Sequence, residues 1–68
     1  MVELNVISVP AFDWEGAEHT AFTVYSYTNG VLRTALGWTL KDAVELYAQY
    51  NGLEKNTIRI RRPFKRQR

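Results

Sequence analysis

Apolar and polar residues alternate with a period of two in several parts of this 68-residue chain, and this period is typical of half-buried β-strands. The first such part covers residues 2–9, and Pro10 is expected to end or bulge this strand because proline cannot donate to a sheet ladder. The last covers residues 57–62, where isoleucines alternate with arginines. Both segments are therefore predicted to be strands.

Between them, residues 21–28 and 31–37 are rich in β-branched and aromatic side chains. They flank Asn29-Gly30, a dipeptide that favours the positive φ angles of a type I′ turn, so a β-hairpin is predicted in which Thr28 pairs with Val31. Four large side chains then share one face, namely Tyr25, Tyr27, Leu32 and Leu36. We expect this face to contact a helix. The opposite face carries Phe22, Val24, Val31 and Ala35 and is a candidate interface.

A helix is predicted over residues 39–51. Thr39 is a typical N-cap and is followed three residues later by Asp42, while Gly52 suits the left-handed conformation that often follows a helix. The apolar stripe at helical spacing comprises Leu40, Ala43, Val44, Tyr47 and Tyr50, widened by Leu46. We expect Tyr47 and the hairpin tyrosines to belong to the core rather than to stack on bases.

The element order β-ββ-α-β predicts an α+β fold, a small and mainly antiparallel sheet with one helix packed on one face. The length allows one domain, which we place at residues 1–64. Residues 65–68 are predicted to form a basic tail that is disordered when free, because its like charges repel one another.

The two signs of charge are segregated along the chain. Residues 1–32 contain four carboxylates and no Lys or Arg, residues 33–58 are balanced, and residues 59–68 contain six basic residues and no acid. We therefore expect a partner-binding surface of Arg59, Arg61, Arg62, Lys65, Arg66 and Arg68, with Arg33 and Trp14 as further contacts. Its partner would be an acidic macromolecular surface.

Residues that would support catalysis or a cofactor are scarce. The chain has no cysteine and a single histidine, His19, and its four glycines are scattered rather than gathered in a phosphate-binding loop. His19 lies in the acidic segment 13–19, where a solvated loop is favoured over a metal or acid–base site. We expect no enzyme activity, no cofactor and no metal. Without a long apolar run or a signal peptide, a cytoplasmic protein without a membrane segment is expected.

The two tryptophans lie outside the best-patterned segments. Tryptophan is enriched among the residues that dominate binding energy, so Trp14 or Trp38 is a candidate anchor for a partner. Trp38 directly precedes the predicted helix and is equally a candidate for a hydrophobic staple at the start of that helix.

Residues 22–63 resemble the small bacteriophage proteins that inhibit host RNA polymerase, of the T7 type. The family has a β-hairpin, a helix and a further strand. Its helix is similar to residues 39–46, and its last strand, with two alternating arginines and a final proline, is similar to residues 58–63. The resemblance implies binding to the β′ jaw of bacterial RNA polymerase and a block to open-complex formation. The family's functional arginines would fall on Arg59 and Arg61, or on Arg62 if the proline sets the register.

Two hypotheses follow for function. In the first, the protein inhibits a large host protein complex, with RNA polymerase suspected, through its arginine strand and tail. In the second, it binds DNA or RNA directly, with basic residues on phosphates and aromatic residues on bases. The sequence favours the first slightly, because the acidic first half would repel a nucleic-acid backbone. It does not define an oligomeric state.

Overall fold

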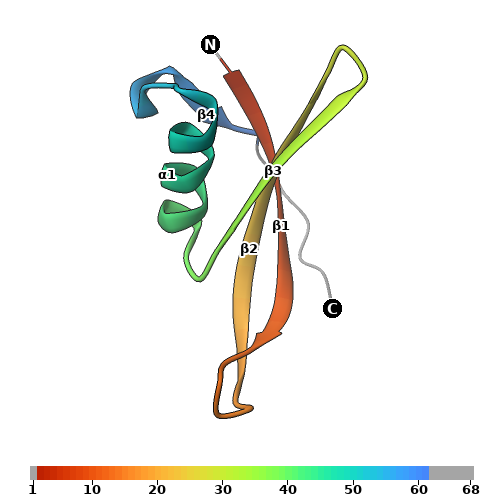
Figure 1. Ribbon diagram of the computed structural model, residues 1–68, viewed down its shortest axis with the longest axis vertical. Coiled ribbons are helices and arrows are strands. Elements are labelled where there is room, and N and C mark those ends of the chain that lie inside the picture. Colours follow the sequence, from red (N-terminus) through yellow and green to blue (C-terminus); the bar gives the residue numbers. More distant parts are fainter. Residues whose placement is uncertain (1, 62–68) are drawn as a thin grey trace.

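The computed structural model describes residues 2–61, which form one four-stranded sheet with one α-helix on one face (Figure 1). Along the chain the elements are β1 (Val2–Phe12), β2 (Glu18–Thr28), β3 (Val31–Gly37), α1 (Leu40–Asn51), the short 3-10 helix η1 (Lys55–Thr57) and β4 (Ile58–Ile60). The strands are arranged in the order β3-β2-β1-β4. The predicted α+β fold is confirmed.

The β2–β3 hairpin has the predicted turn and register. Asn29 and Gly30 have φ angles of 54° and 78°, as a type I′ turn requires. Thr28 lies opposite Val31, and the pairing continues in register to Gly37. This hairpin could be predicted because a two-residue turn fixes the register of the strands that it joins.

β1 is longer than predicted, and the expectation that Pro10 ends or bulges it is wrong. The strand continues to Phe12, and Pro10 lies opposite Thr20 of β2. On its other side, β1 pairs within the described residues with β4 alone, at Val2–Leu4. Around Pro10 that side of β1 is therefore an edge, where the N–H that proline lacks is not needed.

β4 is shorter than the predicted strand at 57–62, and it runs parallel to β1. Thr57 belongs to η1 instead, and its hydroxyl and amide both donate to the Glu54 carbonyl. One further ladder contact follows β4, because the Arg61 amide donates to the Leu4 carbonyl at 2.8 Å. The predicted tail at residues 65–68, together with Arg62, lies outside the described residues.

The predicted helix is confirmed together with both of its caps. The Thr39 hydroxyl accepts a hydrogen bond from the Asp42 amide, and Gly52 adopts a φ of 63°. The predicted apolar stripe is right for Ala43 and Tyr47, which are buried, but wrong for Tyr50, which is 69% exposed. Ala48 is buried instead. The buried side of α1 is therefore the side that carries Tyr47 and Ala48, and Tyr50 lies at its border.

The helix covers the hairpin face opposite to the one we expected. Val24 and Ala35 pack with Ala43 and Tyr47, together with Leu4 and Val6 of β1. Small residues explain the choice of face, because they let α1 approach closely. A Cβ atom added to Gly37 would lie 2.5 Å from the Ala43 amide nitrogen. The larger side chains on the opposite face of the hairpin would hold the helix away from the sheet.

The sheet face away from α1 is called the open face below. Its alternating positions carry exposed Tyr27, Leu32 and Leu36, partly buried Ile7, Val9 and Tyr25, and buried Ala21. The predictions that this face belongs to the core and that the face carrying Val24 is an interface are both wrong. Tyr47 does belong to the core, where its hydroxyl shares a hydrogen bond with the buried Ser26 hydroxyl.

Among residues 2–61, no helix is both long enough and apolar enough to cross a membrane.

Candidate functional site

Two of the predicted basic contacts lie together at the β4 edge of the sheet. Arg59 lies opposite Glu3 of β1 and is exposed. Arg61 forms an ion pair with Glu3, with its Nη2 and Nε atoms 2.9 and 3.2 Å from the Glu3 Oε1 atom. Within the described part of the chain no carboxylate pairs with Arg59. Of these two arginines, Arg59 is therefore the one that remains available for a partner.

The other predicted contacts lie elsewhere or cannot be placed. Arg33 is on β3, at the opposite edge of the sheet, and donates to the Asn51 side chain at 2.6 Å. Trp14 lies in the β1–β2 turn, beyond the end of β1 that is remote from β4. Four predicted contacts lie outside the described residues, namely Arg62, Lys65, Arg66 and Arg68. The described residues thus do not unite the predicted set in one patch.

The described body, residues 2–61, has a different charge from the whole chain. Residues 2–61 contain all seven Asp and Glu residues but only five of the nine Lys and Arg residues, so their formal net charge is −2, against +2 for the full chain. The positive balance thus comes from the residues after 61. Arg59 and Arg61 are a local basic feature on an acidic body.

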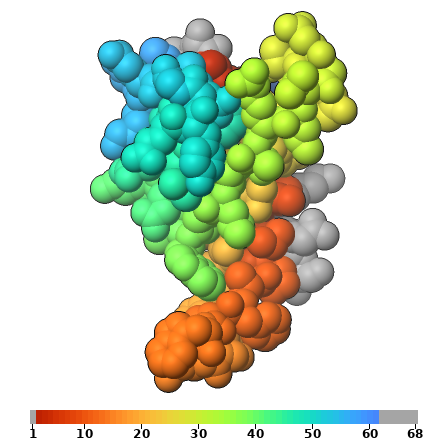
Figure 2. Space-filling model, viewed as in Figure 1, coloured from red at the N-terminus to blue at the C-terminus, as the bar shows by residue number. Residues whose placement is uncertain are grey.

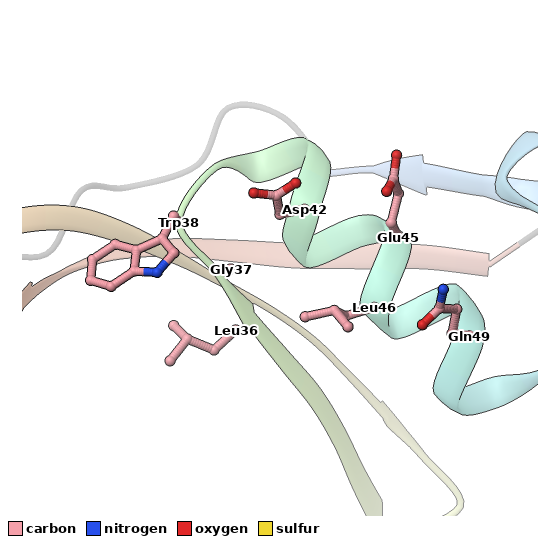
Figure 3. A pocket seen from close by; sticks show the side chains of 7 residues that line it. All are labelled: Leu36, Gly37, Trp38, Asp42, Glu45, Leu46 and Gln49. Atoms are coloured by element: carbon pink, nitrogen blue, oxygen red, sulfur yellow. The ribbon is translucent and has the colours of Figure 1, made fainter. Parts of the chain in front are cut away.

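A second candidate surface surrounds Trp38, which is 51% exposed in the link between β3 and α1. Three hollows share this residue. The first, of about 470 Å³, lies between the end of β3 and the helix (Figure 3). Figure 3 shows Leu46 pointing from α1 toward Leu36 of β3 and Trp38 of the link between β3 and α1. On the helix side, α1 contributes Asp42, Glu45 and Gln49 to the lining of this hollow.

The second hollow, called the tip hollow below, has a volume of about 510 Å³ and lies between Trp38 and the end of the β1–β2 hairpin. In Figure 2 this hairpin end (orange) projects from the body, beside the segment that joins β3 to α1 (green). The lining residues are Phe12, Asp13, Trp14, His19, Thr20 and Trp38. A smaller third hollow, of about 160 Å³, is lined by Ala11 and Ala21 together with Trp38 and the end of β3.

Asp13 organises the hairpin tip. Its Oδ1 atom accepts hydrogen bonds from the Glu15 and Ala17 amides, each at 2.9 Å. Its Oδ2 atom lies 2.7 Å from the His19 Nε2 atom, and the His19 ring meets Trp38 edge-on with 5.5 Å between ring centroids. A chain of contacts thus links the turn to the β3–α1 junction, which are distant in sequence.

These hydrogen bonds have an electrostatic consequence. The bond to His19, followed by those to the backbone of Ala17 and Glu15, holds the pKa of Asp13 below its ordinary value near 3.8. Burial opposes this effect but is outweighed. Asp13 therefore carries a fixed negative charge at neutral pH beside exposed aromatic rings.

Sequence reasoning treated each tryptophan separately and so missed the surface that they share. The available signal was the position of both tryptophans outside the best-patterned segments, together with the acidic segment that contains Trp14, but no local pattern indicates that Trp14 and Trp38 meet. The acidic segment is also shorter than predicted, because Glu18 and His19 belong to β2. Among residues 2–61, no group of three or more acidic, His or Cys side chains is placed to hold a metal ion.

Comparisons of this chain with protein-family models, with curated protein sequences and with solved structures give no match in any of the three.

Proposed function

We propose that this is a non-enzymatic binding protein that inhibits a large bacterial protein machine, with RNA polymerase as the candidate. It would bind through the open face of the sheet and the adjoining arginines of the β4 edge. The identity of the machine rests on the resemblance of residues 22–63 to small bacteriophage inhibitors of RNA polymerase. The geometry of the open face supports the mode of binding.

The observation that carries the proposal is a sheet face, directed away from α1, on which large apolar side chains are exposed. Tyr27 is 70% exposed there, with exposed Leu32 opposite it on β3 and exposed Leu36 four residues further along β3. Exposed large apolar side chains on neighbouring strands are typical of interaction sites, and tyrosine is enriched among residues that dominate binding energy. A protein partner with an apolar patch would bury these side chains.

Arg59 supplies the directional contact. It is held on a strand, so it loses less conformational freedom on binding than a side chain on an unpaired segment would. A guanidinium group can bind a carboxylate through two parallel hydrogen bonds, which fixes the orientation of the partner. Arg61 contributes less in this arrangement, because Glu3 already neutralises it.

The charge of the body favours a protein partner over a nucleic acid. A net charge of −2 on residues 2–61 repels a phosphate backbone. Sheet faces that bind single strands combine aromatic rings with a surplus of basic groups. Here the described part of the chain lacks that surplus.

Direct binding of single-stranded DNA or RNA is the second candidate, and one observation favours it. Tyr25 and Tyr27 lie on the same sheet face as Arg59 rather than in the core. Aromatic rings on an open sheet beside an arginine are a common platform for unpaired bases. The positive charge for phosphates would then have to come from the residues after 61.

Binding to purified RNA polymerase holoenzymes from several bacteria, with promoter opening and transcription measured in parallel, tests the first candidate. We expect inhibition of at least one enzyme, and about tenfold weaker binding for Arg59→Glu and for Tyr27→Ala, since loss of a dominant contact costs more than 1 kcal/mol. Lys41→Glu is the matched control, because it reverses one exposed charge on α1.

The same proteins are titrated against duplex DNA, single-stranded DNA and RNA at physiological salt. Submicromolar binding to any of these, with no effect on the polymerases, overturns the first candidate in favour of the second. Equal losses for Arg59→Glu and Lys41→Glu would instead show that binding depends on net charge and not on the β4 edge. A chain ending at Pro63 measures the contribution of the basic C-terminal residues.

A further inference from the structure

We propose that the tip hollow is a second binding site, which takes an arginine or lysine side chain from a basic peptide segment of a protein partner. This surface differs from the β4 edge in position and in charge. The inference does not depend on the polymerase proposal.

The walls of the hollow suit a cationic side chain. Phe12, Trp14 and Trp38 all line it, and all three are exposed, Trp14 by 92% of its surface. The face of a tryptophan ring attracts a guanidinium or ammonium group, and the rings also shield the aliphatic stem of that side chain from water. A volume of about 510 Å³ is ample for one such side chain.

Among the residues that line the tip hollow, Asp13 provides a carboxylate that is already oriented. The backbone of the turn and His19 hold the Asp13 side chain in place, so little conformational freedom remains to be lost on binding. Each carboxylate oxygen can accept more than one hydrogen bond, so these contacts leave acceptor capacity for a ligand. The lowered pKa of Asp13 keeps it charged over the physiological range.

The surroundings select a basic partner. Asp13, Glu15 and Glu18 cluster around the hairpin tip, and the first 32 residues contain no Lys or Arg. The hollow shown in Figure 3 lies on the other side of Trp38. It is lined by the acidic residues Asp42 and Glu45 and by the apolar residues Leu36 and Leu46. A peptide that places one cation in the tip hollow would continue across Trp38 into a groove that accepts apolar and basic side chains. An acidic or nucleic-acid partner would be repelled.

The chain has two tryptophans, and both line the tip hollow, so intrinsic fluorescence reports directly on this site. Titration with a nine-residue peptide of alternating arginine and glycine should give a saturable change that weakens as salt is added. The matched lysine peptide should bind less tightly, because an ammonium group stacks less well on aromatic rings. The matched glutamate peptide should give no change.

Two variants and a control localise the effect. Asp13→Asn retains an oxygen for the turn amides but removes the charge, and Trp14→Ala removes one wall at a position too exposed to affect folding. Each should weaken binding of the arginine peptide about tenfold, the usual cost of losing a dominant contact. Glu54→Gln, which removes one exposed carboxylate outside the hollow, should change it less than about twofold.

The proposal is overturned if the arginine and glutamate peptides give equal changes. It is also overturned if Asp13→Asn and Trp14→Ala both bind the arginine peptide as tightly as the unmodified chain does. Equal weakening by Glu54→Gln and Asp13→Asn would likewise reject it, by showing that net charge alone draws the peptide.

Discussion

The two ends of β1 carry opposite charges and are held in place by different means. At the first end, the three-residue strand β4 adds Arg59 to the sheet edge through a short parallel ladder, and Arg61 follows directly after it. At the second, β1 and β2 pair over eight positions, and the turn beyond them is closed by Asp13. The basic end thus depends on a short tertiary contact, whereas the acidic end is built mainly from local structure.

This difference shows that segregated charge in a sequence need not produce one functional patch. The acidic first part of the chain is divided in the fold, because Glu3 lies at the basic end and neutralises Arg61 while Asp13 lies at the other end. What distinguishes the ends is the neighbouring apolar surface. The basic end adjoins the open face, and the acidic end adjoins Trp38.

Substitution of Gly37 should have the largest effect on stability and should separate the two ends. An added Cβ atom would meet backbone atoms of Asp42 and Ala43, which cannot move without shifting α1. We expect Gly37→Ala to lower the free energy of unfolding by about 3 kcal/mol, at the upper end of overpacking effects. Denaturant unfolding followed by circular dichroism measures this loss.

The molecules of Gly37→Ala that remain folded should lose binding of the arginine peptide while retaining the binding that depends on Arg59. Val31→Ala is the control, because it alters an exposed residue of β3 that lies outside both proposed surfaces, and it creates no clash. An unfolding free energy for Gly37→Ala within 0.5 kcal/mol of the unmodified chain, roughly the scatter of neutral surface substitutions, would contradict the close approach of α1 to β3.

A smaller effect is expected from Glu3→Gln at the basic end. The pair with Arg61 is largely exposed, so its loss should cost about 0.5 kcal/mol of stability. Removing the carboxylate also frees Arg61, and we expect binding to the polymerase to tighten about threefold through a faster association rate. Stopped-flow association kinetics, with Glu54→Gln as the control of equal charge, measure this. Weaker binding would mean that Glu3 orients Arg61 for the partner.

The smallest effect is expected from acidification at the other end. Because the pKa of folded Asp13 is lowered, the stabilisation that it provides is fully present above its ordinary value near 3.8 and is lost as the pH falls through the folded pKa. Carboxyl carbon shifts from NMR should place the Asp13 midpoint below 3.8. Tryptophan fluorescence should follow the same transition, and Asp13→Asn should abolish it. An unchanged fluorescence transition in that variant would show that another group is responsible.

Several elements could be predicted because their signals are local. Asn29-Gly30 set both the turn and the register of its hairpin, and Thr39 and Gly52 marked the ends of α1. The effect of Pro10 was misjudged, because a proline ends a strand only where its missing N–H would have been needed by a neighbour. Whether a neighbour exists at that position is not a local property.

The site was less predictable than the fold. Alternation over residues 57–62 placed Arg59 and Arg61 on one face, but nothing near them in sequence indicated that Glu3, 58 residues before Arg61, would neutralise one of them. Trp14 and Trp38 share a hollow only because β2 returns His19 to the end of β3. Such contacts follow from strand order, which local patterns do not encode.

The sequence by itself determined the strands, the turn, the capped helix and the alternation of side chains along each strand, since these depend on residues close together in the chain. Only the tertiary structure decided which face of the hairpin α1 covers, because both faces are apolar enough to be buried. The small residues Gly37 and Ala35 allow α1 to approach β3 closely on the face that α1 covers. That choice left Tyr27, Leu32 and Leu36 on the open face and brought Trp38 beside the acidic hairpin tip.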